Sequence, residues 1–379
     1  MSAPSVPDAA DPTGNAGRLA HLPLRDDLRG HTPYGAPQLD VPVRLNTNEN
    51  SYPPPAEVVD AVVAAVRETA VELNRYPDRE FTALREDLAA YLGHDLVADQ
   101  VWAGNGSNEV LQHLLQAFGG PGRRALGFTP AYAMHPIIST GTGTAWVDGL
   151  RGTRDSAFDL TAERAAAQVA EHDPDLVFLC SPNNPTGTAL DLDVVRAVYQ
   201  QARGVVVVDE AYAEFVRPGT PSALTLLPGR ERLVVTRTMS KAFAFAGARL
   251  GYLAADPAVC DAFRLVRLPY HLSALTQAAS RAALWHADVL LSTVEAIKEQ
   301  RDRIVAELPR LGALPVPSDA NFVLFGGLPE AHAVWQGLLD FGVLVRDVGI
   351  AGHLRVTAGT PEETSSFLDS LESVLEVLR

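Results

Sequence analysis

Four consecutive valines at residues 205–208, followed by Asp209, constrain the fold of this chain most strongly. A strand with one face in water alternates apolar and polar residues, whereas a continuous β-branched run needs apolar cover on both faces. Similar runs occur at residues 176–180 and 233–236. A helix is predicted at 191–203, between the strand at 176–180 and the strand at 205–208. Strands that alternate with helices in this way predict an α/β fold with a mostly parallel, mixed sheet flanked by helices.

The length of 379 residues exceeds what one hydrophobic core usually supports, so two domains are expected. A long helical stretch near residues 276–308 precedes a second, shorter series of strands and helices. We therefore predict a smaller α/β domain at the C-terminal end. The predicted organisation is a flexible tail at 1–17, an N-terminal arm at 18–45 that packs with the small domain, a large domain at 46–275 and a small domain at 276–379.

The formal net charge of −15 indicates which partners to expect. A uniformly acidic surface repels nucleic acid and anionic membranes, so neither is an expected partner. The first 17 residues lack the basic and apolar regions of a signal peptide, and the two cysteines, Cys180 and Cys260, are too few for a disulfide framework. Both observations favour a cytoplasmic location. We predict no metal site, and any phosphate-bearing ligand must be bound by a local group of arginines.

Lys241 stands out because residues 242–246 read Ala-Phe-Ala-Phe-Ala. Burial in such a segment favours the neutral amine, which is the form that condenses with an aldehyde. The hydroxyls of Thr238 and Ser240 and the guanidinium of Arg249 could together bind a phosphate. An imine-forming lysine beside a phosphate site indicates pyridoxal phosphate, although a solvated surface lysine is the ordinary alternative.

Other polar residues follow predicted strands, and an open α/β sheet binds its ligand beyond the carboxyl ends of its strands. Asp209 could keep a pyridine nitrogen protonated, or it could equally be the N-cap of a helix. Tyr212 and Asn184 carry groups suited to a phenolate oxygen, and Tyr132 could stack on a flat ring. Turn residues and core tyrosines are the competing interpretations.

The turn at residues 104–108, Gly-Asn-Gly-Ser-Asn, opens a predicted helix. Backbone N–H groups at a helix start can bind phosphate, and the hydroxyl of Ser107 could add to them. The turn lacks the third glycine of a dinucleotide-binding fingerprint and the Gly-Lys-Ser/Thr of a P-loop. It is therefore a weak signal by itself.

Arg346 and Arg355 fall in predicted strands of the small domain. Two cations there, in an acidic protein, need an anion. The anion could be a substrate, and a structural ion pair is the competing explanation.

Several motifs together resemble the fold-type I pyridoxal phosphate aminotransferases, in the order and spacing of that family. These are Ser181-Pro182-Asn183-Asn184-Pro185-Thr186-Gly187, Asp209-Glu210-Ala211-Tyr212, and Thr238-Met239-Ser240-Lys241 through Arg249. Further segments are similar to the histidinol-phosphate aminotransferases within that family. They are Pro33-Tyr34, Leu45-Asn46-Thr47-Asn48-Glu49, Arg75-Tyr76-Pro77, Arg346-Asp347 and Leu354-Arg355-Val356-Thr357.

The resemblance implies a role for each candidate residue. Lys241 forms the imine and shuttles a proton, Asp209 pairs with the pyridinium, and Tyr212 holds the phenolate oxygen with Asn184. The implied cofactor-binding residues are Gly106, Ser107, Asn108, Tyr132, Asn184, Asp209, Tyr212, Thr238, Ser240, Lys241, Arg249 and, from a neighbouring subunit, Tyr76. The implied substrate-binding residues are Tyr34, Asn184, Arg346 and Arg355.

The implied function is transfer of an amino group from L-glutamate to imidazole-acetol phosphate, which gives L-histidinol phosphate, by a homodimer. An aromatic amino-acid aminotransferase or a phospho-amino-acid decarboxylase on the same frame would keep Lys241, Asp209 and Arg355. A non-catalytic regulator that binds pyridoxal phosphate is a further alternative, but such proteins carry a DNA-binding module that the short acidic tail lacks. A dinucleotide-dependent oxidoreductase is disfavoured by the missing fingerprint.

Overall fold

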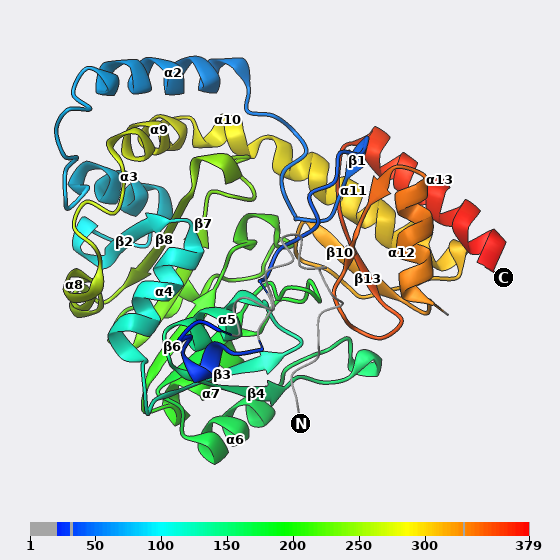
Figure 1. Ribbon diagram of the computed structural model, residues 1–379, viewed down its shortest axis with the longest axis horizontal. Helices are drawn as coiled ribbons and strands as arrows, with labels where there is room; N and C mark the ends of the chain where they lie inside the picture. Colours follow the sequence, from blue (N-terminus) through cyan, green and yellow to red (C-terminus); the bar gives the residue numbers. More distant parts are fainter. Residues whose placement is uncertain (1–20, 31–32, 329, 379) are drawn as a thin grey trace. The chain divides into compact units, whose positions relative to one another are not determined.

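The computed structural model describes residues 21–30, 33–328 and 330–378 (Figure 1). Contacts divide the chain into two compact units. The larger unit comprises Glu49–Glu299 and Pro317–Asn321, and the smaller comprises Met1–Asn48, Gln300–Val316 and Phe322–Arg379 as far as these are described. The predicted tail at residues 1–17 lies outside the described residues, and the predicted domain boundaries stay predictions.

A seven-stranded mixed sheet forms the centre of the larger unit as described. Its strands are β2 (Val101–Asn105), β3 (Arg124–Thr129), β4 (Ala145–Leu150), β5 (Leu176–Cys180), β6 (Val205–Asp209), β7 (Leu233–Thr238) and β8 (Leu250–Ala255), in the order β2-β8-β7-β6-β5-β3-β4. Strand β8 pairs antiparallel with β2 and with β7, and all other pairs in this sheet are parallel. Every residue of β5 and β6 is buried, as a continuous apolar run requires. The predicted mostly parallel, mixed sheet is confirmed.

The larger unit contains ten α-helices in its described part, some of which pack in groups with one another (Figure 1). They are α2 (Ala56–Ala70), α3 (Thr82–Leu92), α4 (Ser107–Phe118), α5 (Met134–Gly141), α6 (Ala162–His172), α7 (Leu192–Gln201), α8 (Pro257–Val266), α9 (Ala274–Trp285), α10 (Ala287–Leu291) and the first part of α11 (Thr293–Glu307). Helix α4 packs against α5 and α8, α6 packs against α7, and α2 lies along α9. Hydroxyl and carboxylate N-caps start several of them, for example Asp191 at α7 and Ser273 at α9.

The helical stretch predicted near residues 276–308 is confirmed, and it consists of three successive helices, α9, α10 and α11. His286 leaves the helical conformation with φ −113° and ψ 26°. Its Nδ1 atom lies 2.9 Å from the carbonyl oxygen of Ala282. This local contact replaces the continuing helical ladder and ends α9.

The smaller unit contains a four-stranded antiparallel sheet and a short parallel pair, as far as it is described. The sheet has the order β12 (Arg346–Asp347), β13 (Leu354–Thr357), β10 (Phe322–Gly326) and β9 (Leu314–Pro315), and the pair joins β1 (Val43–Arg44) to β11 (Val343–Leu344). Helices α12 (Ala331–Asp340) and α13 (Pro361–Leu378) pack against each other (Figure 1). Through β1, the end of the N-terminal arm bonds to this unit, with Leu45 N 2.8 Å from Leu344 O.

Two general properties bear on the predictions from composition. In the described part of the chain, no helix combines the length and the apolar character that crossing a membrane requires. No group of three or more His, Cys, Asp or Glu side chains is placed there to hold a metal ion. Cys180 and Cys260 are both buried and unpaired by disulfides.

Candidate active site

The predicted cofactor residues lie at or just beyond the carboxyl ends of strands of the large sheet. Asp209 ends β6, Thr238 ends β7, and Asn184 lies in the turn after β5. These strands are parallel neighbours, with Cys180 paired to Asp209 and Asp209 paired to Thr236. Their ends therefore meet at one edge, where an open α/β sheet binds its ligand.

Both oxygens of the Asp209 carboxylate are held by neighbours. His135 Nε2 donates to Oδ2 at 3.1 Å, and Thr236 Oγ1 donates to Oδ1 at 3.1 Å. The imidazole of His135 is buried and stacks on Phe178, with ring centroids 4.8 Å apart. Asp209 itself is 2% exposed. A buried carboxylate with two fixed donors keeps a single orientation and remains an acceptor.

Neither His135 nor Thr236 was among the residues predicted from the sequence. Thr236 had a signal, because it lies two positions before Thr238 in a strand and so faces the same side of the sheet. His135 had none, since it lies in α5 within a Gly- and Thr-rich segment whose helix was not predicted.

The structure brings together the two residues predicted to hold a phenolate oxygen. Asn184 Nδ2 donates to the hydroxyl of Tyr212 at 3.3 Å, and both side chains are buried. The neighbouring Asn183 fixes the turn by donating from Nδ2 to Pro130 O at 3.0 Å and to Thr186 Oγ1 at 2.9 Å. The site therefore presents an amide and a phenol side by side on a braced turn.

The residues predicted to bind phosphate also gather around the start of α4. Gly106 has φ 84°, and a Cβ there would lie 2.4 Å from Arg249 Nη2. A Cβ at Gly251 would lie 1.9 Å from the backbone nitrogen of Ser107. Glycine at both positions thus lets Arg249 and β8 approach the N-terminus of the helix, where free N–H groups attract anions.

Two hydroxyls complete this group. Thr238 Oγ1 donates to Ser240 Oγ at 3.0 Å, and the backbone nitrogen of Ser240 donates to Thr238 Oγ1 at 3.1 Å. Thr238 Oγ1 also contacts the carbonyl oxygen of Leu250. Leu250 forms an isolated β-bridge with Gly106, so this contact lies next to the start of α4. Hydroxyls, a guanidinium and a helix start are therefore neighbours, which is a donor set suited to phosphate.

Tyr132 connects the residues predicted to bind phosphate with the residues around Asp209. Its hydroxyl donates to Asn108 Oδ1 at 3.2 Å. Its ring lies edge-to-face with His135, with centroids 5.4 Å apart. Asn108, Tyr132, His135 and Asp209 thus form one continuous series of contacts along the edge.

Lys241 lies in the irregular segment directly after β7, next to Ser240. It is partly buried, and the two following residues, Ala242 and Phe243, are fully buried. Asn50 Nδ2 donates to the carbonyl oxygen of Ala242 at 3.2 Å, which holds the segment in place. The structure therefore places the predicted nucleophile directly after the hydroxyls that are predicted to bind phosphate.

Tyr76 lies apart from these residues within one chain. Its side chain is 80% exposed and stacks on Tyr270, with ring centroids 4.5 Å apart and an interplanar angle of 14°. The prediction that Tyr76 reaches the cofactor phosphate of a neighbouring subunit stays a prediction.

The predicted substrate residues lie in the smaller unit. Arg346 and Arg355 are Cα partners in the pairing of β12 with β13. The guanidinium of Arg346 lies 5.8 Å from the ring of Tyr34, and Arg355 Nη2 donates to Asn46 O at 2.7 Å. In the described part of this unit, no carboxylate lies at ion-pair distance from Arg346. The described residues therefore provide no structural ion pair for Arg346, and its role in substrate binding stays a prediction.

A buried ion cluster holds the same sheet edge from its other face. Arg237 Nη2 lies 2.8 Å from Glu210 Oε2, and Arg237 Nη1 lies 3.3 Å from Glu214 Oε1. Successive residues of a strand point to opposite faces, so Arg237 faces away from Thr236 and Thr238. Burial raises the pKa of the Glu214 carboxyl. The cluster was not predicted from the sequence, and it joins β7 to the segment that follows β6.

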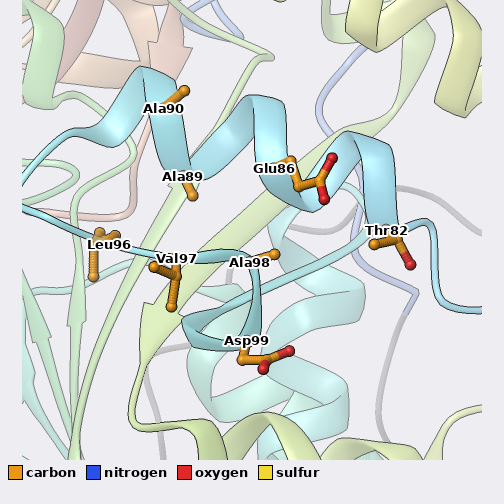
Figure 2. A pocket seen from close by; sticks show the side chains of 8 residues that line it. All are labelled: Thr82, Glu86, Ala89, Ala90, Leu96, Val97, Ala98 and Asp99. Carbon is orange, nitrogen blue, oxygen red and sulfur yellow. The ribbon is translucent and has the colours of Figure 1, made fainter.

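A surface pocket of about 550 Å³ lies elsewhere on the larger unit, between α3 and the short helix η2 (Ala98–Gln100) (Figure 2). Its lining side chains are Thr82, Glu86, Ala89, Ala90, Leu96, Val97, Ala98 and Asp99. None of these belongs to the predicted site. The carboxylate of Asp99 forms an ion pair with Arg85 at 3.3 Å. We propose no catalytic or binding role for this pocket.

Comparison with known proteins defines the class. The family model of aminotransferase class I and II matches residues 41–371. The mixed sheet and the group of residues at its edge are consistent with that match, and the chain belongs to the class I and II aminotransferases.

Individual relatives narrow this further. The histidinol-phosphate aminotransferase of Paenarthrobacter aurescens is 64% identical over 362 residues, which cover 95% of this chain and 96% of the relative. That of Frankia casuarinae is 63% identical and covers 93% of this chain and 90% of the relative. A crystal structure of the Sinorhizobium meliloti histidinol-phosphate aminotransferase in complex with pyridoxal-5'-phosphate has a TM-score of 0.81 at 26% identity, covering 89% of this chain and 92% of that one. Within its class, the chain belongs to the histidinol-phosphate aminotransferase family, which confirms the resemblance stated above.

Proposed function

We propose that this chain transfers an amino group from L-glutamate to imidazole-acetol phosphate, with pyridoxal phosphate as cofactor, and so forms 2-oxoglutarate and L-histidinol phosphate. The observation that carries the proposal is the position of the buried Asp209 carboxylate at the same sheet edge as the Lys241 segment and the phosphate-binding group around Gly106. We propose this substrate because the similar proteins from Paenarthrobacter aurescens and Frankia casuarinae are named histidinol-phosphate aminotransferase.

The residues at this edge fit pyridoxal phosphate group by group. Its phosphate matches the start of α4 with Thr238, Ser240 and Arg249, and glycine at position 106 keeps that approach open. Its ring nitrogen requires a fixed carboxylate, and its phenolate oxygen requires donors such as Asn184 and Tyr212. When bound, the cofactor supplies the electron sink that stabilises a carbanion at the substrate Cα.

The chain contributes position, charge and proton transfer to this chemistry. Asp209, oriented by His135 and Thr236, keeps positive charge on the ring nitrogen. Lys241 Nζ would take the proton from the substrate Cα and pass it to C4′ of the cofactor. Tyr132 stacks on the ring and restricts its plane.

The two substrates carry different anions, and the smaller unit supplies the cations for both. We assign the phosphate of imidazole-acetol phosphate to Tyr34, Arg346 and Arg355, and the carboxylate of glutamate to Arg355. The planar fork of arginine suits both anions. In a chain with a net charge of −15, such a local pair is required to bind them.

We further propose that the enzyme is a cytoplasmic homodimer in which Tyr76 reaches the cofactor phosphate of the partner. Exposed apolar side chains occur in the two segments that carry the stack of Tyr76 on Tyr270, including Leu73 at 52% and Leu268 at 76% exposure. Such side chains are commonly covered by a second protein surface.

The assay that tests the proposed reaction compares two amino acceptors. Purified protein with pyridoxal phosphate and glutamate is given imidazole-acetol phosphate or phenylpyruvate, and kcat/KM is measured for each. We expect a clear preference for imidazole-acetol phosphate. A preference for phenylpyruvate would instead indicate an aromatic amino-acid aminotransferase, and cofactor binding without turnover of either compound would indicate a regulator.

A further inference from the structure

We propose that Arg151 is a positioning residue that ties together the two turns carrying Tyr132 and Asn184, and so sets where these side chains meet the cofactor. The inference rests on the proposed function. Neither the motifs of the sequence nor the roles assigned above include Arg151.

Arg151 directly follows β4 and is 6% exposed. Its Nε donates to Phe128 O at 3.1 Å, and its Nη2 donates to Cys180 O at 3.4 Å. Its backbone nitrogen donates to Thr129 O at 3.1 Å. Phe128 and Thr129 end β3, and Cys180 ends β5, so one residue joins the carboxyl ends of three adjacent strands.

The two strand ends that Arg151 bonds lead directly into the site. Thr129 is followed by the turn that carries Tyr132, and Cys180 is followed by the turn that carries Asn184. Asn183 Nδ2 bonds to Pro130 O at 3.0 Å and provides a second link between the same two turns. Arg151 and Asn183 therefore provide two separate hydrogen-bonded links between the segments that carry Tyr132 and Asn184.

Stability alone does not account for an arginine at this position. Burial lowers the pKa of Arg151 to about 10, and no carboxylate of the described residues lies at ion-pair distance. Arg151 Nη1 and Asn183 Oδ1 are both buried without a hydrogen-bond partner in the described structure. An unmet buried polar atom is destabilising, and an apolar side chain of similar volume would avoid the cost.

The central experiment compares Arg151→Met with a matched control, Arg232→Met. Arg232 Nη1 donates to Ala202 O and Gly204 O at 2.7 Å each, at the amino end of β6 and thus at the opposite edge of the same sheet. Both substitutions remove a guanidinium that bonds main-chain carbonyls. Only Arg151→Met removes bonds to the strand ends that lead into the turns of the site.

Three readouts separate positioning from general support. In Arg151→Met, the dissociation constant for pyridoxal phosphate rises at least about tenfold relative to Arg232→Met, since losing hydrogen bonds from a charged donor has an effect of this order. The pH dependence of the visible absorption of the bound cofactor shifts, because Asn184 no longer holds its place beside Tyr212. Amide hydrogen exchange at residues 181–188 accelerates in the cofactor-free protein. Arg151→Lys, which keeps the charge and one donor group, recovers part of each change.

Asn183→Ser keeps the inference testable if Arg151→Met does not fold, since it leaves Arg151 in place and removes the Asn183 Nδ2 bonds to Pro130 O and Thr186 Oγ1. It is expected to produce the same shifts at smaller size. Variants at both positions could lose thermal stability as Arg232→Met does but keep wild-type cofactor affinity and pH dependence. That result would overturn the inference about Arg151 and leave the proposed function standing. A wild-type protein that takes up no pyridoxal phosphate would overturn the proposed function and this inference with it.

Discussion

Arg346 lies directly opposite Arg355 in the antiparallel pairing of β12 with β13, and both guanidinium groups are largely buried. Residues opposite each other on neighbouring strands share a face, and like charges so placed destabilise the pair. The ring of Tyr34 beside Arg346 and the ring of Phe322 beside Arg355 offset part of this cost. A bound dianion would offset much more, which supports the proposal that this pair binds the substrate anion.

Arg346→Met is expected to separate the two substrates. The KM for L-histidinol phosphate should rise at least about tenfold, since a charge-assisted contact to phosphate is lost. The KM for glutamate should change much less, because Arg355 keeps its carboxylate contact. Steady-state kinetics with each substrate measure the difference, with Arg310→Met as control because Arg310 is an exposed partner of Glu307. Equal increases in both KM values would contradict the assignment.

His135→Phe tests the support given to Asp209. Phenylalanine preserves a ring that can stack on Phe178 but cannot donate to the carboxylate. A hydrogen bond to a charged group contributes roughly 1.5–3 kcal/mol, so kcat should fall by about tenfold or more. Asp209→Asn, which removes the charge itself, should lower kcat further. A His135→Phe enzyme with kcat within about twofold of wild type would show that Thr236 alone orients the carboxylate.

Mixed dimers test whether Tyr76 acts across the subunit interface. Tyr76→Phe keeps the stack on Tyr270 but loses the hydroxyl, so homodimers of this variant should bind pyridoxal phosphate about tenfold more weakly. In a dimer with a Lys241→Ala chain, the site that contains Lys241 receives an intact Tyr76 only from the partner. Wild-type cofactor retention at that site is therefore expected. Retention as weak as in the Tyr76→Phe homodimer would place Tyr76 within its own subunit or outside the site.

The stability of the protein should fall on mild acidification because of two buried histidines. Burial lowers the pKa of His113 to about 4 and also lowers the pKa of His271, whose ring lies 5.3 Å away. The Nδ1 atom of His113 accepts from Trp102 Nε1 at 3.3 Å, which requires the neutral ring. The groups that face it are Glu109, which favours protonation, and His271 and Arg267, which oppose it.

The direction of the effect follows from the proton count. Between about pH 6.5, where histidine in the unfolded chain titrates, and about pH 4, the unfolded state binds protons that the folded state does not. The stabilisation is thus complete above pH 6.5 and is lost as the pH falls towards 4. Denaturant midpoints measured from pH 7 to pH 5 should decrease, and less steeply in His113→Gln, which keeps an acceptor for Trp102. An unchanged slope in that variant would remove His113 from the explanation.

The sheet and its ligand-binding edge could be predicted because their signal is local. The valine run before Asp209 requires cover on both faces, and polar residues after successive strands mark one edge. Strand β8 was missed because it runs antiparallel and includes Gly251. A glycine is needed there because the backbone of Ser107 lies against it, and this contact is visible only in the fold. Helix α5 was missed because it is short and its sequence, Met-His-Pro-Ile-Ile-Ser-Thr-Gly, has low helix propensity, and packing against α4 compensates for it.

The supporting residues of the site could not be predicted from the sequence for a related reason. His135, Arg151 and the pair of Arg237 with Glu210 bind atoms that are far from them along the chain. Which atoms they meet depends on strand order and register. No spacing in the sequence specifies either, so these residues became visible only in the fold.

The site of covalent attachment of pyridoxal phosphate tests the central claim most directly, and the composition makes the test simple. The sequence contains two lysines, Lys241 and Lys298, and Lys298 Nζ lies 2.7 Å from Glu295 Oε1 within α11. The purified protein is loaded with pyridoxal phosphate, reduced with borohydride and analysed by peptide mass. We predict that the cofactor mass is added at Lys241, and that prior addition of glutamate, which leaves its amino group on the cofactor, prevents this addition. Labelling of Lys298, or of neither lysine, would contradict the account.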